Sequence, residues 1–208
     1  MLYALVGDER ITATPSARGK CDSCPSTMIA KCGKIMIWHW AHESLDHCDP
    51  WRQGETAWHL GWKAKFPKEF AERQIIRDGK KHIADILLPN GKVIEFQHSP
   101  ISSEEIAERE SFYKNILWVF DATDAAENGR FQMYEKDGYW TFRWKAPRKT
   151  IRRCRLPIYI DIGDGQMFEI RKIYTATESY NPDRPRPWFG WGKLTYEDLF
   201  LKQHMPVP

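Results

Sequence analysis

Two carboxylates stand in adjoining runs of β-forming residues, in the segment HIADILLPNGKVIEFQHS at residues 82–99. If the turn is a three-residue loop at 89–91, with its glycine in the left-handed conformation, Asp85 lies directly opposite Glu95. Side chains paired in this way have Cβ atoms about 4.5–5.5 Å apart, and two like charges so placed are destabilising unless a positive group lies between them. A divalent cation such as Mg2+ meets that need, because it prefers carboxylate oxygens.

The length of the turn decides whether this metal site exists. A two-residue turn of Asn90 and Gly91 is the alternative, since Asn-Gly is a strong hairpin signal by itself. That turn would set Asp85 opposite Phe96 and send Glu95 to the other face of the hairpin. The metal site is therefore predicted only with the three-residue loop.

A second set of polar residues precedes the hairpin. Glu55, His59 and Lys63 recur at every fourth position of WRQGETAWHLGWKAKF and would share one face of a helix. Taken alone, they are typical of a solvated ladder of i, i+4 pairs that contributes a few tenths of a kcal/mol per pair. Beside the carboxylate pair, the same face would point towards the metal.

The elements that must position these residues follow from turn and capping signals. Asp-Gly at 78–79 and the turn before residue 92 divide a three-stranded meander. Ser-x-x-Glu spacing at 102–105 predicts a helix start, and ILWVFD is typical of a buried strand. After the helix that carries Glu55, we expect strands at 70–77, 80–88 and 92–98, a helix at 103–113 and a strand at 116–121.

The first 48 residues are rich in metal ligands. C-x2-C and H-x2-H motifs predict a zinc module of about 50 residues, because so small a core needs a structural ion. The predicted Zn2+ ligands are Cys21, Cys24, His39 and His42. Three further residues keep the fourth ligand open: Cys32, His47 and Cys48. After Pro50 the composition changes, so we expect domains at 1–50 and 51–208.

Residues beyond 122 alternate apolar and polar types between Gly-containing turns, which predicts further β-hairpins. Basic residues are interleaved with Tyr139, Trp140 and Trp144, which could stack on bases, although a half-solvated strand is the more common explanation. Residues 181–193 are expected to form a loop before a short helix near YEDLF.

The composition is that of a globular protein of 208 residues, with 42% hydrophobic and 28% charged residues. A net charge of +3 permits a nucleic-acid partner without requiring one. We expect a cytoplasmic protein, because the sequence shows neither a signal peptide nor the roughly 20 apolar residues of a membrane span. Five cysteines in a reducing compartment favour thiols or metal ligands over disulfides. The sequence does not predict the oligomeric state.

The order of elements and the Asp85, Glu95-Phe96-Gln97 spacing resemble the PD-(D/E)xK nuclease core. More closely, HIADILLPNGKVIEFQHSPIS, GETAWHLGWK, CDSC and HWAH together resemble the competence protein CoiA-like family of nucleases, over residues 1–122. Ala84 stands where a proline often occurs in the superfamily. Gln97 stands where a catalytic lysine usually occurs, and CoiA-like proteins resemble this chain in that glutamine. The resemblance implies an α+β fold with a restriction-endonuclease-like core, in which helices flank a mixed sheet, plus the zinc module.

The resemblance also implies a nuclease that hydrolyses DNA with Mg2+ or Mn2+. Asp85 and Glu95 would hold the ion with waters and the carbonyl of Phe96, while Glu55 would reach it from the helix. His59 or Lys63 would supply positive charge near the scissile phosphate. Gln97, a neutral donor and acceptor, would orient the attacking water.

An alternative is a catalytically inactive nucleic-acid-binding or adaptor protein that uses the zinc module and a basic-aromatic surface. In either case the zinc module could also bind a protein partner. The pair of Asp85 and Glu95 favours the enzyme, because a protein gains nothing from negative charge beside phosphate without a metal.

Overall fold

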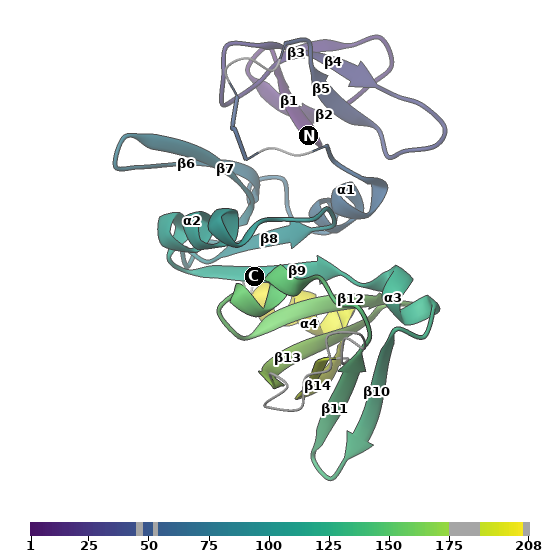
Figure 1. Ribbon diagram of the computed structural model, residues 1–208. Coiled ribbons are helices and arrows are strands. Elements are labelled where there is room, and N and C mark those ends of the chain that lie inside the picture. The colour runs from purple at the N-terminus through teal and green to yellow at the C-terminus, as the bar shows by residue number, and fades with distance from the viewer. Residues whose placement is uncertain (45–47, 52–53, 175–187, 206–208) are drawn as a thin grey trace. The chain divides into compact units, whose positions relative to one another are not determined.

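The computed structural model describes residues 1–44, 48–51, 54–174 and 188–205. The chain forms two compact units, Met1–His98 and Ser99–Pro208 (Figure 1). The domain boundary expected at residue 50 falls inside the first unit, and it stays a prediction. None of the helices in the described ranges is long and apolar enough to span a membrane.

The first unit begins with a five-stranded antiparallel sheet in the order β2-β1-β3-β4-β5. Its strands are β1 (Tyr3–Val6), β2 (Glu9–Thr12), β3 (Arg18–Lys20), β4 (Thr27–Lys31) and β5 (His39–His42). The core of this sheet contains Met28 and Trp40, which are fully buried. The indole of Trp40 donates to the carbonyl of Ile11, so the buried ring also satisfies its polar atom.

A helix and an antiparallel meander complete this unit: α1 (Ala57–Ala64), β6 (Ala71–Arg77), β7 (Lys80–Leu87) and β8 (Val93–Gln97). The three strands agree with the predicted ranges to within about one residue at each end. The helix is shorter than expected, because Thr56 caps it by accepting from the His59 amide. Glu55 therefore precedes the helix and does not belong to its face.

The turn between β7 and β8 is the three-residue loop. Leu88 donates to the carbonyl of Lys92, and Gly91 has φ +77°, the left-handed conformation that favours glycine. Leu87 pairs with Val93, and Ile86 pairs with Ile94. The next positions along this register are Asp85 and Glu95, as the longer turn predicts.

The second unit combines helices with a mixed sheet. Its strands run in the order β10-β11-β14-β13-β12-β9, in which β12 and β9 are parallel and the other neighbours are antiparallel. Its elements are α2 (Ser103–Tyr113), β9 (Ile116–Asp121), α3 (Thr123–Glu127), β10 (Phe131–Lys136), β11 (Tyr139–Trp144), the 3-10 helix η1 (Lys149–Arg153), β12 (Ile158–Gly163), β13 (Gln166–Tyr174), β14 (Trp188–Tyr196) and α4 (Glu197–His204). The predicted helix at 103–113, strand at 116–121 and terminal helix are confirmed.

Two expectations for this unit need correction. Residues 181–187 of the expected loop lie outside the described residues, whereas 188–193 belong to β14. Gly190 and Gly192 allow this strand to lie against buried phenylalanine rings, where a Cβ atom would clash. Trp144 is buried and Trp140 packs on the core, so Tyr139 alone of the three proposed stacking residues is exposed.

Candidate active site and metal centre

Asp85 and Glu95 lie where the regular pairing of β7 and β8 ends. Asp85 Oδ2 accepts a hydrogen bond from the Phe96 amide at 2.9 Å, and Glu95 Oε1 accepts one from the Asp85 amide at 3.2 Å. Each carboxylate thus binds the backbone of the opposite strand. Only 3% of Glu95 is exposed, whereas the side chain of Asp85 is 15% exposed. The two carboxylates are therefore held in place, and Asp85 is the more open to solvent.

His59 approaches the same carboxylate from α1. Its Nε2 lies 2.8 Å from Asp85 Oδ2, and Lys63 Nζ, one helical turn later, lies 3.9 Å from Asp85 Oδ1. Burial raises the pKa of Asp85, but the charge and hydrogen bond of His59 and the charge of Lys63 outweigh it and lower that pKa below its ordinary value. Asp85 is consequently ionised at neutral pH.

Lys63 lies at the centre of a buried ion cluster. Its ammonium contacts Glu55 and lies 2.6 Å from Glu72 Oε1. Lys63 and Glu72 are only 2% and 1% exposed. Glu72 also accepts hydrogen bonds from the amides of Leu2 and Tyr3, which tie the N-terminal sheet to β6. Sequence reasoning missed Glu72, because a glutamate at the start of a strand has no local signal for burial.

The charges of this cluster stabilise one another. Burial lowers the pKa of Lys63, but Glu55 and Glu72 more than offset this effect and raise the pKa above its ordinary value. Burial raises the pKa of Glu55, yet Lys63 and the Met1 nitrogen lower it well below its usual range. Glu55 is therefore a carboxylate paired with a lysine in this structure.

Gln97 lies two residues after Glu95 in β8, so the two side chains share one face of the strand. It is buried, like Glu95. The structure thus places the six predicted active-site residues on α1, at the residue before its cap, and on the neighbouring strands β7 and β8.

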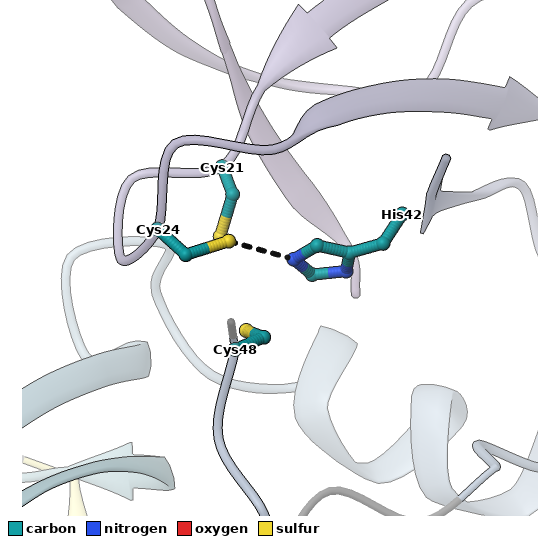
Figure 2. A group of neighbouring side chains, drawn as sticks. All are labelled: Cys21, Cys24, His42 and Cys48. Carbon is teal, nitrogen blue, oxygen red and sulfur yellow. Dashed lines mark hydrogen bonds between the residues drawn. The ribbon is translucent and has the colours of Figure 1, made fainter. Parts of the chain in front are cut away.

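Three thiols and one imidazole converge in the N-terminal module (Figure 2). They belong to Cys21, Cys24, His42 and Cys48, and their ligand atoms all lie within 4.8 Å of one another. Cys24 Sγ lies 3.3 Å from His42 Nε2, and the Ser23 amide donates to Cys21 Sγ. Three sulfurs and one imidazole nitrogen at this spacing fit the donor set of a structural zinc site.

Cys48 takes the place that the sequence analysis assigned to His39. Both predicted histidines lie in β5, and residues three apart on a strand point to opposite faces. His42 therefore faces the thiols, while His39 Nδ1 lies 2.9 Å from the carbonyl of Ile37. Cys32 is not part of the group, and His47 lies outside the described residues.

The electrostatics of the thiols favour metal binding. The hydrogen bond with Cys21 and the contact with His42 lower the pKa of Cys48 to about 3, although burial opposes them. The same hydrogen bond and burial raise the pKa of Cys21. A thiolate within a cluster of thiols is a ready metal ligand.

Asp49 connects this metal centre to β7. Asp49 Oδ1 lies 2.9 Å from His82 Nδ1, and its Oδ2 accepts a hydrogen bond from the Ile83 amide. Cys48 precedes Asp49 directly, and Ile83 lies two residues before Asp85. The candidate metal ligand is thus joined to the strand that carries Asp85, the candidate active-site aspartate.

The fold and these two sites define a protein with a nuclease-like α+β domain and an N-terminal Cys/His module. The family model described as competence protein CoiA, N-terminal domain, matches residues 13–50. The model described as competence protein CoiA, nuclease-like domain, matches residues 74–183. The chain belongs to the competence protein CoiA family, as the resemblance predicted. No curated protein and no solved structure matches it.

Proposed function

We propose that this protein is a metal-dependent nuclease that hydrolyses DNA phosphodiester bonds. The observation that carries the proposal is the pair of opposed carboxylates, Asp85 and Glu95, each fixed by a backbone amide of the neighbouring strand. The nuclease-like family domain supports a hydrolase that binds nucleic acid. A buried pair of acids is costly for stability, and a site for a cation explains why two such residues are placed together.

Asp85 and Glu95 are the residues that would hold Mg2+ or Mn2+. Two carboxylates fit Mg2+, which usually binds one or two of them and completes its octahedral shell with waters and substrate oxygens. The ion would supply Lewis-acid stabilisation of the charge that develops on the phosphate. Glu55 was the expected third carboxylate ligand, but it contacts Lys63. Among the described residues, no third ligand residue forms a metal-binding group with Asp85 and Glu95. Glu55 therefore supports the site through Lys63 in this proposal.

His59, Lys63 and Gln97 have supporting roles in the proposed reaction. His59 holds the Asp85 carboxylate, with its Nε2 2.8 Å from Asp85 Oδ2, so it is placed to move a proton beside that carboxylate. The burial of Lys63 favours a positioning role, through Asp85, over contact with a phosphate. Gln97, on the Glu95 face of β8, would orient the attacking water.

A cleavage assay on circular and linear, single- and double-stranded DNA tests the proposal. Purified protein should cut at least one form with Mg2+ or Mn2+, and Asp85→Asn and Glu95→Gln should each abolish cutting. Asp78→Asn is the matched control, because Asp78 is exposed in the β6–β7 turn and its φ of +50° suits asparagine. Lack of cleavage with both metals, or full activity in Asp85→Asn, would overturn the proposal.

A further inference from the structure

The outer face of the mixed sheet in the second unit carries aromatic and cationic side chains. On three neighbouring strands, β11, β14 and β13, Arg143 pairs with Phe189, and Tyr174 pairs with Phe189 from the other side. Directly opposed residues share a face, so these three side chains form one row across the sheet. Lys172 pairs with Trp191 in the next row. We call Tyr139, Arg143, Lys172, Tyr174, Phe189 and Trp191 the aromatic face.

The opposite side of the same strands forms the core. Phe142 and Phe168 are fully buried there, and each lies where the Cβ of a glycine in β14 would be. The aromatic face is therefore not needed to close the hydrophobic core of this unit. Part of its side of the sheet is covered, since α4 places Phe200 against the ring of Tyr159 in β12 at 4.9 Å. The helix thus covers β12, while rings on β11, β13 and β14 stay exposed.

Three of the four rings of this face are about half exposed. Tyr139, Tyr174 and Phe189 have exposed fractions between 44% and 49%. Tyr139 lies edge-on to Trp191, with ring centroids 6.3 Å apart. Rings on one face of a sheet, held by cross-strand pairing, offer preformed platforms on which planar groups can stack.

The cations of this face have no carboxylate partner within the described parts of the chain. Arg143 lies over the ring of Phe189 at 6.0 Å, and its buried Nε lacks a hydrogen-bond partner. Lys172 lies over Tyr174 at 5.2 Å. Two uncompensated positive charges beside stacking rings complement a ligand that combines flat aromatic groups with negative charge.

We infer that the aromatic face binds single-stranded nucleic acid, with bases stacked on its rings and phosphates beside Arg143 and Lys172. A single strand fits better than a duplex, because bases that are paired and stacked in a duplex cannot stack on the rings of this face. The inference goes beyond the proposed cleavage and does not depend on it, since none of these residues belongs to the carboxylate site.

Equilibrium binding of the full chain to a fluorescent oligothymidine, without added divalent metal, tests the inference. The double variant Tyr174→Ala/Phe189→Ala should weaken binding by about 25-fold or more, because it removes two base–ring stacks and each contributes about fivefold to a hundredfold. Tyr196→Ala is the matched control, since Tyr196 is a half-exposed ring on β14 outside the face, and it should bind as the wild type does. Arg143→Ala should lower the slope of log affinity against log salt by about 0.7.

The same measurements separate the alternatives. Glu95→Gln should not weaken this metal-free binding, so loss of cleavage and loss of binding are distinguishable. Equal affinity of the double variant and the wild type would overturn the inference, as would equal losses for duplex and single strand. A change from dimer to monomer in the double variant, without a change in DNA binding, would assign the face to a second copy of the chain.

Discussion

Asp85 and Glu95 exchange hydrogen bonds with each other's strands, in place of the ordinary backbone pairing. The carboxylate of Asp85 accepts from Phe96, next to Glu95, and the carboxylate of Glu95 accepts from the amide of Asp85 itself. The two carboxylates thus accept hydrogen bonds from the backbone of the neighbouring strand at the point where the regular backbone pairing stops. This arrangement makes each carboxylate part of both the fold and the candidate site.

The first prediction concerns stability at this junction. Asp85→Ala leaves the partly buried Phe96 amide without its acceptor, so it should lower the free energy of unfolding by about 1–3 kcal/mol. Asp85→Asn keeps an acceptor oxygen, so it should cost less. Urea unfolding of both variants gives the comparison. Equal losses would mean that the hydrogen bond to Phe96 does not stabilise the hairpin.

Lys63 is predicted to be essential to the fold. Lys63→Met removes the charge that compensates Glu55 and Glu72, and breaking a buried pair in this way costs about 3–5 kcal/mol. Lys65→Met, at the exposed end of the same helix, should change stability by less than about 0.5 kcal/mol. Thermal unfolding of the two variants tests the difference. Similar melting temperatures would show that the cluster contributes little.

Acid should destabilise the first unit through its lowered carboxyl pKa values. The pKa values of Asp85 and Glu55 are lower in the folded chain than the ordinary value of about 4 in the unfolded chain. The unfolded state therefore binds protons first, and stability present above about pH 4 is lost as the pH falls through the folded pKa values. Lys63 acts in the opposite range, since its raised pKa contributes stability that is lost only at alkaline pH.

The variant Asp85→Asn isolates the aspartate in this acid dependence. Its unfolding free energy should fall less steeply between about pH 5 and 3 than that of the wild type, because one shifted carboxyl group is removed. Both proteins should be compared at equal zinc content, since acid also protonates thiolate and imidazole ligands. Parallel pH profiles would contradict the assigned pKa shift.

Zinc binding should depend on Cys48, which the structure groups with the other candidate ligands, and not on His39, which the H-x2-H spacing predicted. Cys48→Ser should lose most of its bound zinc and His39→Ala should keep it, because Cys48 belongs to the converging group and His39 does not. Elemental analysis of protein purified without chelator measures both. Cys32→Ser is the matched control for loss of a thiol outside the group. Zinc retained in Cys48→Ser and lost in His39→Ala would restore the original ligand set.

Much of this protein follows from its local sequence. Turn and capping signals act within a few residues, so the strands of the meander, the helix that follows Ser102 and the loop that ends at Gly91 were all predictable. The loop in turn determines the register, which places Asp85 opposite Glu95. Side-chain alternation then assigns Gln97 to the face of Glu95.

Other features depend on contacts between residues that are distant in the chain. The choice of Cys48 over His39 required knowing that β5 is a strand and that Cys48 lies beside the C-x2-C turn. The role of Glu72 could be recognised only from its tertiary contacts. Its carboxylate accepts a hydrogen bond from an amide of the N-terminal segment and pairs with the buried Lys63. Local sequence determines secondary structure and register because those depend on nearby residues, whereas burial and charge pairing are decided only when distant segments pack together.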